Sequence, residues 1–164
     1  MKKIIGLIFS LLIFSGCGFS PVYSPSAEMS APSADVYVAT ISGTNGIDLR
    51  NSLRAKFETD NNIGAKYTLK VDLQKPQTAY KAIQITGDAT WQEVRMTATY
   101  VLTETNSGRE ILNAKDTASE SYTFVRDLVA AQASYNNAVQ STLRLLSEKI
   151  VTRINAELAT GDGK

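Results

Sequence analysis

The spacing of apolar side chains changes three times along the chain, and these changes predict its elements. The clearest pattern is Ala65–Gln74, where apolar and polar residues alternate strictly. Ten residues of this alternation are typical of a strand with one buried and one solvent-facing side. Pro76 then interrupts the pattern, so we expect a bulge or a sheet edge there.

Strand-like patterns recur on both sides of this segment. Asp35–Ser42 is apolar on both faces, as in a strand covered on both sides. After Pro76 an extended run resumes at Tyr80–Ile85, and a turn is expected at Gly87-Asp88. Two longer strands follow, Thr90–Glu104 and Arg109–Val125, joined by a hairpin turn at Asn106-Ser107-Gly108.

Two segments instead repeat their apolar residues every three or four positions, which predicts amphipathic helices. The first is Ile47–Glu58, where Leu49, Leu53 and Phe57 form one stripe. The second is Leu128–Leu158. Its stripe consists of Tyr135, Val139, Leu143, Leu146, Ile150, Ile154 and Leu158.

The resulting order is β-α-β-β-β-α, which predicts an α+β fold. We expect a four-stranded mixed sheet with both helices packed on one face, because the apolar side of the strands needs cover. Residues 35–160 then form one domain, and residues 161–164 a frayed tail.

Composition excludes several kinds of chemistry. The 164 residues contain 17 basic and 16 acidic side chains, one cysteine and no histidine. Near-zero net charge argues against nucleic-acid binding, and the lack of histidine removes Ser-His-Asp triads and His-ligated zinc. No phosphate-binding or metal-binding motif occurs, so we expect no enzyme activity, cofactor or metal.

A few side chains near the predicted Gly87-Asp88 turn have a chemical and an ordinary interpretation. Asp88 and Glu93 could form the carboxylate pair of a glycosidase, but two solvated surface acids are the favoured interpretation. Trp91 could stack on a sugar or a lipid, although a core or rim aromatic is more common. Lys66, Lys70 and Arg95 could form a phosphate-binding row, against the simpler interpretation of a solvated face.

The first residues are typical of a secretory signal. Lys2 and Lys3 precede the apolar run Ile4–Phe14, which is too short to span a bilayer as a helix. Phe14-Ser15-Gly16-Cys17 resembles a bacterial lipobox, which predicts cleavage after residue 16 and lipidation of Cys17. The alternatives are a retained membrane anchor and a free or intermolecularly paired thiol.

Residues 17–34 are expected to form a lipidated tether, because Pro21, Pro25 and Pro32 oppose regular structure. An aspartate directly after the lipidated cysteine resembles an inner-membrane retention signal, but this chain has Gly18 at that position. We therefore expect the protein in the outer membrane, with its body facing the periplasm. Loss of residues 1–16 removes two lysines and leaves 15 basic against 16 acidic residues.

The run Cys17-Gly18-Phe19-Ser20-Pro21-Val22-Tyr23 resembles the start of the mature chain in the LPS-assembly lipoprotein family, LptE. The predicted order of helices and strands is also similar to the fold of that family. The resemblance implies a partner, the outer-membrane LPS-assembly β-barrel protein, whose lumen the lipoprotein plugs and whose folding it supports. It also implies contact with lipopolysaccharide in transit to the cell surface.

Family members are proposed to bind lipopolysaccharide through basic residues near the long hairpin tip and after the fourth strand. Here the tip, Gly87–Thr90, has no basic residue, so the candidates are Lys81, Arg95 and Arg126. The alternative function is an auxiliary lipoprotein of another envelope transport complex, of the ABC type or one that carries lipid.

Overall fold

The structure is a computed structural model that describes residues 35–58, 64–83, 90–124 and 127–161. The predicted signal peptide, Cys17 and the tether therefore lie outside the described residues, as do Asp88 and Arg126. The elements are β1 (Val36–Val38), α2 (Thr44–Phe57), β2 (Tyr67–Leu73), β3 (Gln77–Ile83), β4 (Thr90–Glu104), β5 (Glu110–Phe124) and α3 (Leu128–Gly161).

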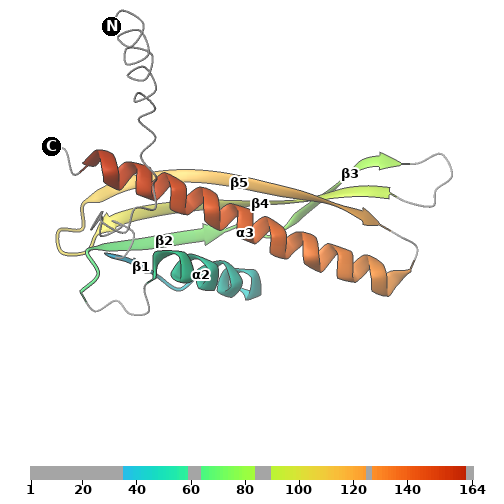
Figure 1. Ribbon diagram of the computed structural model, residues 1–164, viewed down its shortest axis with the longest axis horizontal. Helices are drawn as coiled ribbons and strands as arrows, with labels where there is room; N and C mark the ends of the chain where they lie inside the picture. The colour runs from blue at the N-terminus through green and yellow to red at the C-terminus, as the bar shows by residue number, and fades with distance from the viewer. Residues whose placement is uncertain (1–34, 59–63, 84–89, 125–126, 162–164) are drawn as a thin grey trace, which may run out of the picture.

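The sheet is organised around β4 (Figure 1). β5 pairs antiparallel with β4 along its whole length, with Thr97 opposite Thr117. On the other side of β4, β2 pairs with the second half of that strand and β3 with the first half. β1 pairs in parallel with β2, so the sheet is mixed, as predicted.

The sheet has five strands rather than four. Gln77–Ile83 forms a strand of its own because Pro76 interrupts the extended run that starts in β2. The register shift of β3 lies further along, between Tyr80 and Ala82, and not at Pro76 where a bulge or a sheet edge was expected. The predicted strand Asp35–Ser42 is shorter, at Val36–Val38. Gly161, assigned to the tail from the sequence, is the last residue of α3.

Both helices pack on one face of the sheet, as predicted, and share one apolar core with it. The stripe of α2, Leu49, Leu53 and Phe57, is fully buried. The predicted stripe of α3 is also buried, except for the half-buried Tyr135. From β4 the core receives Val94, Met96, Ala98, Tyr100 and Leu102. Each such aliphatic side chain contributes about 1.5–3 kcal/mol on burial, so these stripes account for much of the stability.

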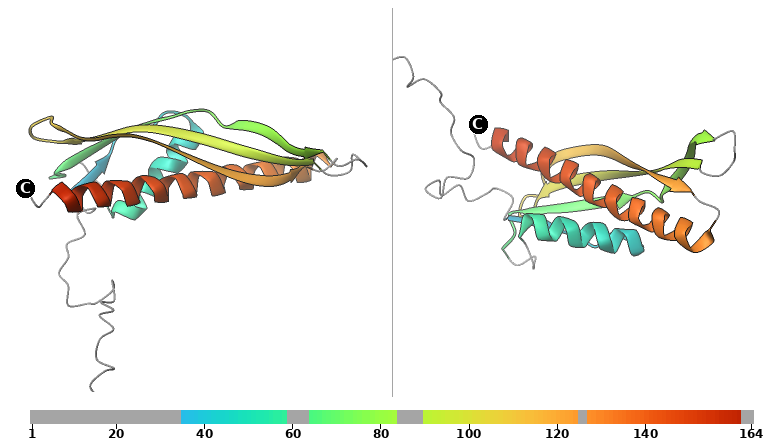
Figure 2. Two further views of the ribbon diagram at one scale, coloured as in Figure 1. Left: turned by 90° about the horizontal axis from the view of Figure 1, so that it is seen from above. Right: turned by 45° about the vertical axis from the view of Figure 1, so that its right-hand side comes forward.

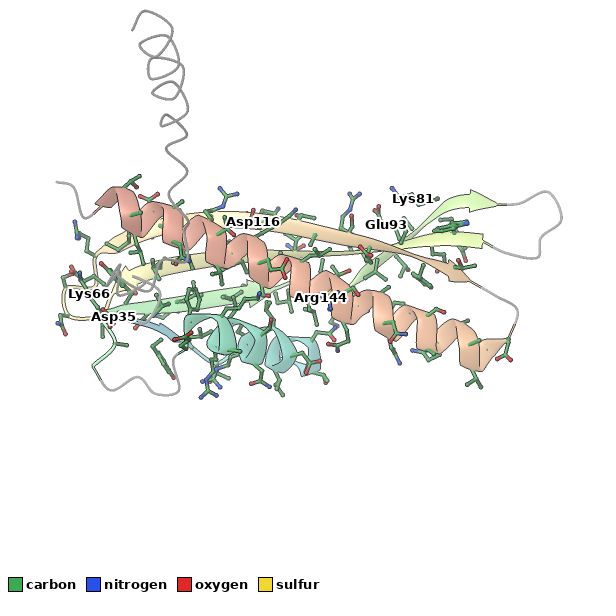
Figure 3. The ribbon with its side chains drawn as sticks, viewed as in Figure 1. Asp35, Lys66, Lys81, Glu93, Asp116 and Arg144 are labelled. Carbon is green, nitrogen blue, oxygen red and sulfur yellow. The ribbon has the colours of Figure 1, made fainter. Side chains whose placement is uncertain are left out.

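The molecule is elongated, and α3 runs along the length of the sheet (Figure 2). β3 and the start of α3 lie at one end, which we call the distal end. β1 and the last turns of α3 lie at the opposite end. Asp35, where the described chain begins, is therefore far from the distal end (Figure 3).

Two glycines are required by geometry. Gly108 closes the β4–β5 hairpin with a φ of 70°, a left-handed conformation that favours glycine. Gly46 lies inside α2, where a Cβ would be 2.9 Å from the side chain and carbonyl oxygen of Ile41. This close approach explains a glycine in a helix, where it otherwise costs about 1 kcal/mol.

Candidate functional site

Two of the three predicted lipopolysaccharide-binding residues lie together near the distal end. Lys81 of β3 and Arg95 of β4 both form ion pairs with Glu93 of β4 (Figure 3). The Lys81 Nζ to Glu93 Oε2 distance is 3.0 Å, and the Arg95 Nη2 to Glu93 Oε1 distance is 2.9 Å. We call these three residues the Glu93 cluster.

Glu93 lies between the two cations and is 9% exposed. The hydrogen bond from Lys81 is the largest cause that lowers the pKa of this carboxyl, and Arg95 lowers it further, against the opposing effect of burial. Glu93 is therefore ionised at neutral pH, and the cluster has a net charge of one positive unit rather than two. An anionic ligand at this place has to compete with Glu93 for its two cations.

The proposed row of Lys66, Lys70 and Arg95 is not formed. Lys70 of β2 lies opposite Val101, whereas Arg95 lies opposite Gln77 of β3. Six residues of β4 separate these two positions, which is about 20 Å along a strand. The row does not form because β2 and β3 pair with different halves of β4. All three side chains are exposed, as the favoured interpretation of a solvated face expected.

The opposite side of the sheet from the helices carries hydroxyl groups. We call it the hydroxyl face, and its central residues are Thr97, Thr99, Thr103, Thr117, Ser119 and Ser121. The hydroxyl groups of Thr97 and Thr117 are 3.0 Å apart across the β4–β5 pair. The sequence analysis did not single out this face, although serine or threonine recurs at many outward positions of both strands. Val101 interrupts the series in β4, and Lys115 precedes it in β5.

A second polar cluster fastens α3 to the sheet. Arg153 of α3 donates two hydrogen bonds to the Asp116 carboxylate of β5, at 2.8 and 3.1 Å. The buried Tyr100 hydroxyl of β4 donates a third, at 2.6 Å. Burial raises the pKa of Asp116, but the hydrogen bonds from Arg153 and Tyr100 outweigh it, and the pKa lies below its ordinary value.

This Asp116 cluster has a structural role, because Asp116 is 9% exposed and its carboxylate pairs with Arg153 of α3 (Figure 3). One turn away, Lys149 Nζ donates to the backbone oxygen of Thr117 at 2.7 Å. That bond occupies an acceptor on the outer edge of β5, and a covered edge is protected against pairing with another chain. Neither contact was predicted from the sequence.

The remaining sequence candidates for chemistry are not supported by their surroundings. Glu93 is held by two cations, which favours the ionised form and opposes the role of a general acid. Trp91 is 47% exposed on β4 and is thus a rim aromatic. In the described parts of the chain, no three acidic, cysteine or histidine residues gather as a metal site. No helix there is both long and apolar enough to span a membrane.

Comparison with solved structures places the fold among bacterial lipoproteins. A protein from Caulobacter crescentus CB15 aligns with a TM-score of 0.64 at 19% identity, covering 82% of this chain and 96% of its own. The rare lipoprotein B of Shewanella oneidensis aligns with a TM-score of 0.60 at 13% identity, covering 77% and 98%. The minor lipoprotein of Acinetobacter baumannii gives 0.56 at 18% identity, covering 75% and 94%. At these identities the likeness shows the fold.

No curated protein sequence matches the chain. The LptE family, described as lipopolysaccharide-assembly, matches over residues 33–154. This range covers most of the chain and begins after the Cys17–Tyr23 motif. The match therefore supports the family resemblance independently of that motif. The protein belongs to the LptE family of lipopolysaccharide-assembly lipoproteins.

Proposed function

We propose that the protein is lipidated at Cys17, anchored in the outer membrane and facing the periplasm, and that it occupies the lumen of the LPS-assembly β-barrel protein. In this position it supports folding of the barrel and assists the transfer of lipopolysaccharide to the outer leaflet. It acts by binding rather than by catalysis. Family membership over residues 33–154 supports the role in lipopolysaccharide assembly.

The observation that carries the plug role is the hydroxyl face. Barrel lumens are lined by polar side chains, so a plug needs a polar surface on the sides that meet the wall. Thr97 and Thr117 illustrate the match, because a hydroxyl group both donates and accepts hydrogen bonds. The apolar side chains of the same strands are instead used in the core under α2 and α3.

Direct contact with lipopolysaccharide is proposed at Lys81 and Arg95, with Arg126 as a third candidate outside the described residues. Lys81 is 47% and Arg95 54% exposed in their side chains, so both can reach a phosphate group. Because Glu93 already pairs with both, we expect this contact to be weak and sensitive to salt.

Co-purification from outer membranes in mild detergent tests the proposal. We expect a large β-barrel at near-stoichiometric amount with the lipoprotein. A transporter component in its place would favour the alternative, an auxiliary lipoprotein of another envelope transport complex. Recovery of the lipoprotein without any barrel would overturn the plug role.

A further inference from the structure

Two adjoining hollows form a groove between α2 and α3. Their volumes are about 430 Å³ and 310 Å³. Asp48 of α2 and Gln140 of α3 line both of them, so the hollows are parts of one depression, which we call the interhelix groove. Each volume lies within the range of ligand pockets, which is about 300–1,000 Å³. The groove is therefore large enough for a small ligand.

Polar side chains dominate the lining of the interhelix groove. The hydroxyl and amide groups that line it include those of Asn45, Ser52, Asn137, Gln140 and Ser141. Asp48 and Arg144 are the only charged side chains among the described residues that line it. Ligand pockets are usually lined mostly by apolar side chains, so this lining favours a polar ligand.

Several of these polar groups have no partner within the described protein. Among the described residues, no side-chain hydrogen bond or ion pair is formed by Asn45, Asn137, Ser141 or Arg144. The Asp48 carboxylate accepts one hydrogen bond, from Gln140 at 2.9 Å, and forms no ion pair with Arg144 although both line the first hollow. The carboxylates of Glu93 and Asp116, in contrast, are each held by two donor residues. The interhelix groove therefore retains donors and acceptors for a ligand.

The helices hold these groups in fixed positions. Residues three and four apart lie on one face of a helix, and α3 presents to the groove Asn137, Gln140, Ser141 and Arg144. The buried stripes fix both helices on the sheet, and the hydroxyl groups of Ser52 and Ser147 join them at 2.9 Å. Figure 3 shows Arg144 on the part of α3 that lies beside α2. The site is thus preorganised, which lowers the cost of binding a ligand.

The spare groups suit a ligand that carries many hydroxyl groups. A hydroxyl group both donates and accepts, so neighbouring hydroxyls can bond the Asp48 carboxylate, the amides and the Arg144 guanidinium together. A phosphate group would be repelled by Asp48 in the same hollow, and an acyl chain would leave the polar lining without hydrogen bonds. Tyr135 lines the second hollow and offers an aromatic ring on which the apolar face of a sugar can pack.

We infer that the interhelix groove binds the neutral sugar units of an envelope polysaccharide. Asp48 accepts from the sugar hydroxyls, and Asn137 and Arg144 donate to them. Lipopolysaccharide and peptidoglycan both carry sugar hydroxyls of this kind, so the shared chemistry is that of a neutral oligosaccharide. The site is separate from the Glu93 cluster and requires no barrel, so the inference goes beyond the proposed function.

Titration calorimetry with the full-length lipoprotein tests the inference, in a detergent that has no sugar headgroup. One probe is chitotetraose, whose N-acetylglucosamine units also occur in peptidoglycan. The other is the dephosphorylated oligosaccharide of lipopolysaccharide, cleaved from its lipid. We expect saturable binding of at least one probe, and the probe that binds identifies the source. If neither probe binds, the inference is overturned.

Variants of exposed side chains locate the binding. Arg144→Met should weaken sugar binding by at least about tenfold, because it removes a charged donor, and Asn137→Ala by about three- to tenfold. Asn51→Ala is the matched control and should bind like the parent, because Asn51 is an exposed asparagine of α2 that does not line the groove. Equal melting temperatures would show that all three variants fold. If all three bind sugar like the parent, the inference fails, whereas the plug role is decided separately by the co-purified barrel.

Discussion

The Asp116 cluster offers a sharp test of how α3 is held on the sheet. We expect Tyr100→Phe to lower the free energy of unfolding, because the change removes one hydroxyl group and keeps the ring that fills the core. Tyr100 is 1% exposed and its hydroxyl donates to the Asp116 carboxylate at 2.6 Å. A hydrogen bond to a charged acceptor is worth about 1.5–3 kcal/mol.

The same magnitude sets the expected shift in melting temperature. For a chain of this length, 1 kcal/mol corresponds to about 2–4 °C, so Tyr100→Phe should melt about 3–12 °C below the parent. Arg153 still pairs with Asp116 in the variant, so the carboxylate keeps a partner and the loss stays within this range. Removing the carboxylate itself should cost more, since two donors then lose their acceptor.

Urea unfolding followed by circular dichroism measures the difference. Tyr67→Phe is the matched control, because Tyr67 lies on β2 of the same sheet and its hydroxyl has no hydrogen-bond partner among the described residues. The control should unfold like the parent. If Tyr100→Phe also unfolds like the parent, the Tyr100–Asp116 bond does not contribute, and the assigned role of the cluster is wrong.

The pH dependence gives a second check with a defined sign. The pKa of Asp116 is lower in the folded protein than its ordinary value of 3.8, so the ionised carboxylate stabilises the fold above that pH. The difference between parent and Tyr100→Phe should be constant from pH 7 to about pH 5 and shrink below pH 3.8, as Asp116 protonates. A difference that grows on acidification would contradict this assignment.

Four further changes test other parts of the structure. Leu146→Asp should lower the free energy of unfolding by about 4 kcal/mol or more, because Leu146 is fully buried, whereas Leu145→Asp, on the exposed side of α3, should cost little in the same denaturant titration. Gly46→Ala should cost about 1–3 kcal/mol in thermal melts, since the added methyl group would lie 2.9 Å from a backbone oxygen. Glu93→Gln should strengthen binding to lipopolysaccharide vesicles by freeing two cations, and unchanged binding would argue against contact at this cluster. Cys17→Ser should move the protein from the membrane fraction to the soluble fraction; retention in the membrane would contradict lipid anchoring at this residue.

Most of the fold was predictable from the sequence because the periodicity of apolar residues is local. Ala65–Gln74 and the stripe of Leu128–Leu158 each repeat with the period of the element that they form. The strand pattern of β5 was weaker for a physical reason. Its inward positions include Asp116, a charge placed where an apolar side chain is expected, and only its partners on other elements explain it.

The candidate site was less predictable, because it depends on which residues the register brings together. Lys81 and Arg95 were identified as cations, but their joint pairing with Glu93 follows from the β3–β4 register. The alternative in which Arg95 joins Lys70 is excluded for the same reason, because β2 and β3 pair with different halves of β4.

By itself the sequence determined the helices, most of the strands and, from their order, the α+β class, since the periodicity of each element depends on neighbouring residues only. The anchor at Cys17 stays a prediction from the sequence. The tertiary structure decided the rest. It made Gln77–Ile83 a separate strand, because a strand is defined by the partner with which it pairs. It also joined Asp116 to Arg153 across 37 residues of chain and brought Asp48 and Arg144 to one groove. Side-chain spacing carries no information on such contacts, because they depend on how separate elements pack in space.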